Sequence, residues 1–201
     1  MQVPRFALLC VAAAALWLGA TGAAFQRSDA FPESRHHPNV KYGSTPPSDA
    51  MSRLNAKVEQ GDLKLSYEPG GRGYLKALLD ALGIDASSQV LVYSGTSLQA
   101  SYISEQNPRA IYFNDDVAVG WIRGAPVLEI AAQDPRLGTV FYTLSQTEAA
   151  SPRASRVETC LSCHLSWDTR AVPGVFVLTT FPRKSDNDYA SGGLSDHREP
   201  V

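Results

Sequence analysis

The sequence predicts an α+β protein, an antiparallel β-meander with a small N-terminal helical layer. Three observations support this class. Two segments between residues 48 and 83 repeat apolar side chains at helical spacing. From residue 90 the period changes to two, in short runs rich in β-branched and aromatic residues. Clusters of Asn, Asp, Gly and Pro separate these runs, as expected of tight connections between neighbouring strands.

Two helices form the predicted helical layer. Ser48 is placed to cap the first helix and Gly61 to end it. The second helix is predicted from about residue 73 to residue 82, with Gly83 as the residue that ends it. Each helix has one apolar face, made by Met51, Leu54 and Val58 in the first and by Leu75, Leu78, Leu79 and Leu82 in the second.

Short apolar runs predict the strands. Four of them follow in close succession between Ala110 and Ser145, which predicts the meander. Turn residues lie between them at 114–116, 124–126 and 134–135. The predicted strands are Val90–Tyr93, Ile111–Phe113, Val117–Ile122, Val127–Ala131 and Val140–Leu144, with Val175–Phe181 as a candidate for one more.

The composition divides the chain into four parts. Residues 1–24 carry one positive charge, an apolar run and then small residues, which is the layout of a secretory signal peptide. Residues 25–47 form a polar, proline-rich arm that we expect to bury little surface. Residues 48–182 are the predicted domain. Residues 183–201 are a polar tail without a closing element, so we expect the chain to be a fragment of a longer product.

Charge and hydropathy limit the partners and the location. The formal net charge is −2, and loss of Arg5 with the signal makes it one unit more negative. Such a mild charge gives no reason to expect nucleic acid as a partner. Beyond the signal no apolar stretch approaches the length of a membrane-spanning helix. We therefore expect a periplasmic or otherwise exported protein with no transmembrane helix in the mature chain.

Cysteine usage carries the chemical prediction. Cys10 lies inside the signal, so the mature chain keeps only Cys160 and Cys163, within the sequence C-L-S-C-H. C-x-x-C-H is the attachment motif for c-type haem. Two thiols at this spacing can bond the two vinyl groups of one porphyrin, and the adjacent His164 can donate a nitrogen to the iron. The sequence thus predicts covalent haem c, with its iron, at a haem-attachment segment near the C-terminal end.

Three alternatives to haem attachment stay open for the two cysteines. A redox dithiol normally follows a strand at a helix N-terminus, whereas the dozen residues before Cys160 are polar and include Pro152. A zinc site would need ligands from His36, His37 or His197 at a spacing unlike any compact finger. A disulfide between two cysteines so close together would restrict the unfolded chain little. Haem attachment is the favoured interpretation.

A second axial ligand is less defined by the sequence. His37, followed by proline in a polar arm, has few structural reasons to be present and is a candidate. Met51 is the other candidate, although a methionine on an apolar helix face is more often core filler. His36 and His197 lie in strongly polar segments, where solvated side chains are expected. Two further alternatives are an open or water-bound position and a ligand in the part of a longer product that we expect to follow this chain.

Four segments resemble a known group of proteins. Residues 88–94, residues 107–116, the motif at 160–164 and the Val172–Gly174 segment are similar to exported bacterial proteins described as cytochrome c domain-containing. The resemblance covers most of the chain from about His37 onward. It implies Cys160 and Cys163 as thioether sites and His164 as the proximal iron ligand, and it implies no substrate.

The layout differs from that of small all-helical cytochromes c, where the motif comes near the N-terminus and a methionine ligand follows it. Here no methionine follows the motif within the 201 residues. We expect an exported monohaem protein that carries single electrons between redox partner proteins. A haem c enzyme with an open distal site, of peroxidase type, and a binding module of a larger redox assembly are the alternatives. An electron carrier is favoured over a catalyst, because no acid or base partner is evident near the motif.

Overall fold

The computed structural model describes residues 35–93, 97–166 and 169–175. The predicted signal peptide, the first ten residues of the arm and the polar tail lie outside the described residues. So does the predicted strand 175–181, apart from its first residue. The described chain forms one antiparallel sheet with short helices, which confirms the α+β class.

The sheet is a meander of six strands in sequence order, and each strand pairs with its neighbour antiparallel. It is larger than the four-stranded meander predicted between residues 110 and 145, because a strand is added at each side. The added strand at the C-terminal side was not predicted, since it is only two residues long and lies in a polar segment. The strands are β1 (Val90–Val92), β2 (Arg109–Phe113), β3 (Val117–Trp121), β4 (Val127–Asp134), β5 (Gly138–Ser145) and β6 (Ser155–Arg156).

Helix α3 (Ala50–Gln60) forms the first part of the helical layer. Its N-cap is Asp49, whose side chain accepts a hydrogen bond from the Ser52 backbone N–H at 2.8 Å. The prediction that Ser48 caps the helix was wrong, because Ser48 lies one residue too early. Gly61 ends the helix as predicted, with a left-handed φ of 81° that suits glycine.

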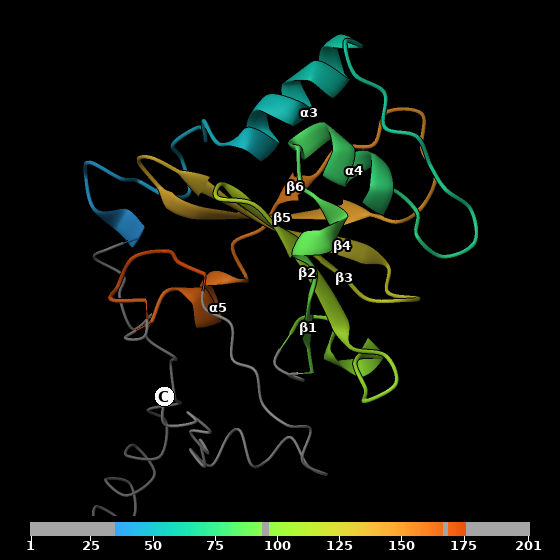
Figure 1. The fold of residues 1–201 in the computed structure, drawn as a ribbon. Helices are drawn as coiled ribbons and strands as arrows, with labels where there is room; N and C mark the ends of the chain where they lie inside the picture. The colour runs from blue at the N-terminus through green and yellow to red at the C-terminus, as the bar shows by residue number, and fades with distance from the viewer. Residues whose placement is uncertain (1–34, 94–96, 167–168, 176–201) are drawn as a thin grey trace, which may run out of the picture.

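Helix α4 (Leu75–Leu82) begins two residues later than predicted. The Gln146 side chain accepts from the Tyr74 backbone N–H at 2.9 Å, so a residue far away in sequence caps this helix. Gly83 ends the helix in the left-handed region, as predicted. Both helices lie on the same side of the sheet (Figure 1). Their apolar faces are buried in a core with the sheet, together with Tyr112, Val119, Leu128, Ile130, Val140, Tyr142 and Leu144.

The two faces of the sheet have different neighbours. The Tyr142 hydroxyl donates to the Asp49 carboxylate at the start of α3, at 2.5 Å, so Tyr142 points to the helical face. Because side chains alternate along a strand, Phe141 points to the opposite face. The short helix α5 (Leu161–His164) lies on that opposite side of the sheet (Figure 1). The predicted haem-attachment motif is therefore separated from α3 and α4 by the sheet.

The turn between β4 and β5 is built around the buried carboxylate of Asp134. One oxygen accepts from the backbone N–H and the hydroxyl of Ser48, at 2.6 and 3.0 Å. The other accepts from the backbone N–H groups of Arg136 and Leu137, each at 2.9 Å. Burial alone would raise the pKa of Asp134, but these hydrogen bonds outweigh it and lower the pKa below its ordinary value.

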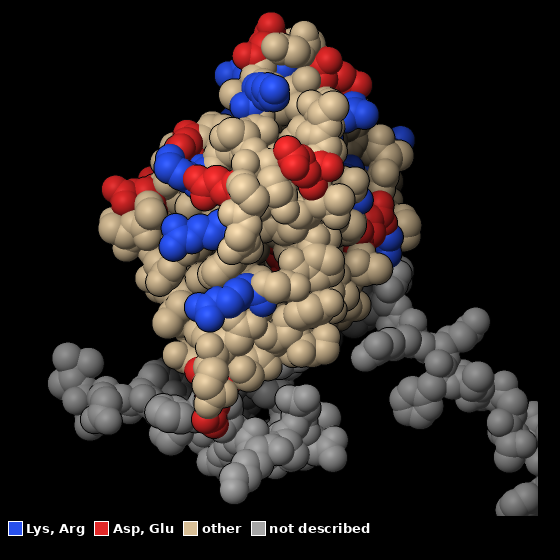
Figure 2. Space-filling model, turned by 90° about the vertical axis from the view of Figure 1, so that its right-hand side faces the viewer, with Lys and Arg blue, Asp and Glu red and all other residues tan. Residues whose placement is uncertain are grey.

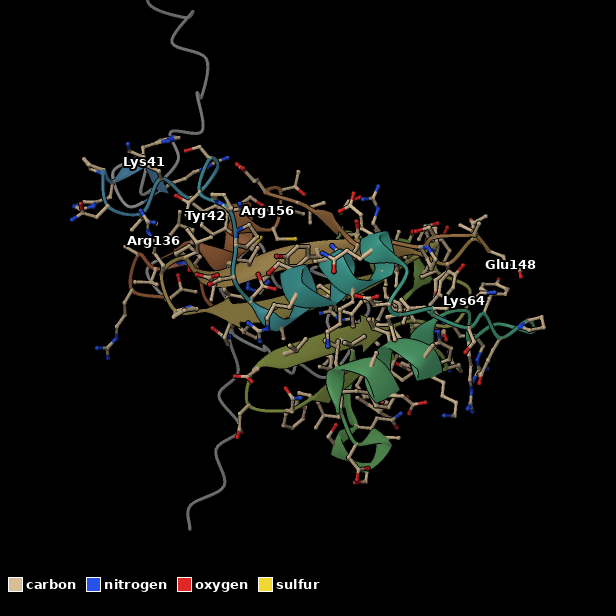
Figure 3. The ribbon with its side chains drawn as sticks, turned by 90° about the horizontal axis from the view of Figure 1, so that it is seen from above. Lys41, Tyr42, Lys64, Arg136, Glu148 and Arg156 are labelled. Atoms are coloured by element: carbon tan, nitrogen blue, oxygen red, sulfur yellow. The ribbon has the colours of Figure 1, made fainter. Side chains whose placement is uncertain are left out.

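Residues 35–47, the described part of the polar arm, lie along the body of the protein. Tyr42 anchors this segment: its side chain is fully buried and its hydroxyl donates to the Thr139 carbonyl at 3.0 Å. The Arg156 guanidinium lies over the Tyr42 ring, 4.4 Å from its centre, and also donates to the carbonyls of Tyr42 and Thr45. Figure 3 shows Tyr42 and Arg156 side by side at one end of the sheet. The arm prediction did not include this anchor.

Charged side chains of both signs are interspersed on the face drawn in Figure 2, with uncharged surface between them. This face therefore has no continuous field of one sign. None of the helices within residues 35–93, 97–166 and 169–175 combines the length and the apolar character that a membrane span requires.

Candidate functional site

The motif occupies one helical turn held on the sheet by two leucines. The His164 backbone N–H donates to the Cys160 carbonyl at 2.9 Å, which closes the turn. Leu161 and Leu165 are buried in the core and fix the turn from one side. Cys160 is half-buried and Cys163 is exposed. Residues at offsets of three and four share one side of a helix, so Cys160, Cys163 and His164 are neighbours.

His164 is fixed by a reciprocal pair of hydrogen bonds with Gly174. Its Nδ1 lies 2.9 Å from the Gly174 carbonyl oxygen, and the Gly174 backbone N–H donates to the His164 carbonyl at 3.0 Å. Because a carbonyl can only accept, Nδ1 carries the hydrogen. In the neutral imidazole Nε2 then bears the lone pair, which is the tautomer that a metal-binding histidine needs.

The His164 ring packs against Phe141 on the sheet face opposite to α3 and α4. The two ring centres are 4.7 Å apart and the planes are inclined by 40°. Burial lowers the pKa of His164, and the positive charge of Arg109 lowers it further. The bond to Gly174 and the charge of Glu129 act in the other direction but do not outweigh these effects. His164 is therefore neutral at pH 7, which is the state in which an imidazole ligates a metal.

The loop that carries Gly174 is fastened to the β4–β5 hairpin. The Thr139 backbone N–H donates to the Pro173 carbonyl at 2.8 Å. Gly138 has a φ of 74°, and a Cβ at this position would lie only 2.7 Å from the Pro173 oxygen. A side chain at Gly138 would thus be strained and would displace the loop. The sheet therefore positions Gly174, and through it the imidazole of His164.

The two thiols differ strongly in environment. Burial raises the pKa of Cys160 to about 11, and the negative charge of Glu129 adds to the rise. Both cysteines are free thiols in the structure. A reactive redox dithiol requires a lowered thiol pKa. The environment of Cys160 has the opposite effect, which weakens the redox-dithiol alternative.

This difference predicts unequal alkylation of the haem-free protein. At about pH 8, iodoacetamide is expected to modify the exposed Cys163 much faster than Cys160, because a pKa raised to about 11 lowers the thiolate fraction of Cys160 tenfold for each unit of the rise. The measurement is mass spectrometry of tryptic peptides over a time course. Denaturant should remove the difference. Equal rates in the folded protein would contradict the raised pKa of Cys160.

The candidate second ligands lie in different places. Met51 is fully buried beneath α3, in the core on the helical side of the sheet, so the structure does not bring it to the motif. His37 is exposed, and its Nδ1 accepts from the Asn39 backbone N–H at 3.2 Å. His36 is exposed as well. His197 lies outside the described residues.

Within residues 35–93, 97–166 and 169–175, no three His, Cys, Asp or Glu side chains are grouped so that they could hold a metal ion. The three-ligand zinc alternative therefore receives no support from His36 or His37. The Cys160–His164 turn supplies two sulfurs and one nitrogen.

Comparisons with known proteins identify no relatives. No family model matches the chain, and neither a curated protein nor a solved structure is detectably similar to it. The resemblance to exported cytochrome c domain-containing proteins thus stays a prediction from the residues.

Sequence reasoning did not find the residues that surround the motif. Phe141 and Glu129 lie in strands separated from the motif by a connecting segment, and only the fold brings them near it. Gly174 follows the motif by ten residues, and nothing in the sequence indicates its contact with His164. The signal that could have suggested Glu129 is a charged residue in the otherwise apolar run over residues 127–132.

Proposed function

We propose that this protein is an exported monohaem c-type protein that carries single electrons between redox partner proteins. The observation that supports the proposal best is the Cys160–His164 turn, in which Gly174 holds the imidazole in the tautomer with a lone pair on Nε2. Attached haem c would supply a one-electron iron couple. The chain would supply the attachment, one axial ligand and the surroundings that tune the couple.

The thiols would hold the haem by addition to its two vinyl groups. In each addition the sulfur bonds one vinyl carbon, and the thiol hydrogen ends on the other vinyl carbon, so no electrons are exchanged. Cys163 is exposed, while Cys160 is half-buried beside the core. Free thiols at both positions fit this role, whereas a disulfide would have to be reduced first.

The histidine fits the role of proximal ligand for three reasons. Its lowered pKa keeps it unprotonated near pH 7, so iron would not compete with a proton. The Gly174 carbonyl fixes its tautomer, as the outer hydrogen bond of metal-bound histidines generally does. Phe141 holds the ring from one side. These contacts fix the ring before any ligand binds, so little ordering free energy is lost on ligation.

The test is mass spectrometry of the exported protein after co-expression with a complete cytochrome c maturation system. The expected mass exceeds that of the mature polypeptide by one haem, and the haem stays bound in denaturant. The Cys160→Ala, Cys163→Ala double variant is the control and should have the bare polypeptide mass. A wild-type protein without haem under these conditions would refute the proposal. Recovery in the periplasmic fraction tests the predicted export.

A further inference from the structure

An ion pair lies on the sheet face that carries the motif. Arg109 on β2 and Glu129 on β4 are joined by a 2.7 Å contact between Nη1 and Oε2, and each side chain is only 19% exposed. By the strand register their neighbours on this face include Ile111, Gly120 and Ala131. Withdrawing two charges from water into apolar surroundings is costly. Because of this cost, stability alone does not account for the pair at this place in the sheet.

The pair is held in one geometry by the strand between its partners. Gly120 on β3 lies beneath it, and a Cβ there would come within 3.3 Å of Cδ of Arg109. The absent side chain leaves room for the guanidinium to cross β3 and reach Glu129. The Ser97 hydroxyl donates to the second oxygen of Glu129 at 3.1 Å. Both oxygens of the carboxylate are thus engaged, which fixes the position of its charge.

The register places this carboxylate near the imidazole of the motif. Glu129 pairs with Thr143 on β5, and Phe141 lies two residues from Thr143 on the same face. Glu129 and Phe141 are therefore diagonal neighbours across the strand pair. Phe141 in turn packs against the His164 ring. In agreement with this placement, the charge of Glu129 acts on the pKa values of both Cys160 and His164.

We propose that Arg109 and Glu129, two residues of opposite charge, set the reduction potential of the haem held at Cys160, Cys163 and His164. This inference rests on the proposed function. Oxidised haem iron carries one more positive charge than reduced iron, so a fixed carboxylate nearby stabilises the oxidised state and lowers the potential. The guanidinium has the opposite effect. Because the partly buried pair is weakly screened, both effects are large enough to measure.

The test is spectroelectrochemical titration of the haem-loaded protein and its variants. Glu129→Gln is expected to raise the midpoint potential by about one tenfold change in the oxidised-to-reduced equilibrium, about 59 mV for a one-electron couple. Arg109→Gln is expected to lower it. The double variant should lie between the two single variants. The matched control is Glu59→Gln, which breaks the exposed Glu59–Arg153 pair beside α3, on the other side of the sheet, and should leave the potential unchanged.

The outcomes separate this inference from the proposed function. If the wild type carries no haem by mass, both proposals fail. If it carries haem and neither the Glu129 nor the Arg109 variant shifts the potential beyond the control, only this inference fails. Glu129→Gln leaves Arg109 unpaired and could fail to fold for that reason. The double variant, which lacks both charges, then replaces it. Arg109→Gln keeps the carboxylate and the double variant does not, so the double variant must have the higher potential of the two.

Discussion

Replacing His164 by glycine is expected to leave haem bound through the cysteines but to change its absorption spectrum, and added imidazole is expected to restore the wild-type spectrum. The substitution removes the nitrogen proposed to ligate the iron, while Phe141 and the Gly174 carbonyl stay in place to hold a free imidazole. In the haem-free protein the same change should lower the free energy of unfolding by about 1–3 kcal/mol, from one aromatic contact and one hydrogen bond. Absorption spectra and urea titrations measure both effects.

His36→Ala is the control for this prediction, since His36 is exposed and its loss should change neither the spectrum nor stability. A His164→Gly protein with the wild-type spectrum in the absence of imidazole would show that another residue ligates the iron. The thioether sites would be unaffected by that result. It would, however, remove the role given to Gly174 and Phe141.

Replacing Asp134 by asparagine is expected to lower the free energy of unfolding by about 2–4 kcal/mol. The carboxylate accepts four hydrogen bonds, two on each oxygen. The asparagine side chain has an NH2 group in place of one oxygen, and this group would face two of the donors. Asp85→Asn is the matched control. Asp85 also accepts from a backbone N–H two residues ahead, at 2.7 Å, but it is exposed. Asp85→Asn should therefore lower the free energy of unfolding far less than Asp134→Asn. Urea titrations at pH 7 compare the two variants with the wild type.

The pH dependence of this effect follows from the lowered pKa of Asp134. A carboxyl group whose pKa is lower in the folded state stabilises the protein above its unfolded-state pKa, about 3.9. This contribution is lost as the pH falls through the lower pKa of the folded state. The stability difference between wild type and Asp134→Asn should therefore shrink on acidification. A constant difference down to about pH 2 would mean that the Asp134 carboxylate is not stabilised in the fold.

The elements that could be predicted are those whose signal is local. The helical faces around Met51 and Leu78 and the alternation in β4 and β5 are repeated patterns, so their class and approximate extent followed from the sequence. Strand β6 was missed because two polar residues have no periodicity. The Ser48 cap was wrong because Ser and Asp are equally good caps, and the helix begins one residue later, where the Asp49 carboxylate accepts from the Ser52 backbone N–H.

The surroundings of the candidate site could not be predicted, for the same reason. The motif residues are contiguous, so their spacing alone predicts haem attachment, which stays a prediction. Phe141, Glu129 and Arg109 join the motif through strand register and the docking of α5, which depend on contacts between distant parts of the chain. Met51 was a plausible ligand by residue type, but helical packing directs it into the core on the other side of the sheet. Residue type alone therefore cannot assign a side chain to one face or the other.

The turn from Asp134 to Gly138 constrains how this protein can vary in length. At one end the Asp134 carboxylate binds Ser48 at the entry to α3. At the other end Thr139, which follows Gly138, donates its backbone N–H to the Pro173 carbonyl. A residue inserted there would shift both attachments at once, so homologues and engineered forms should keep this connection at constant length. The exposed Gly70–Gly71 pair, with open space beside it, is the place where a peptide tag can be introduced.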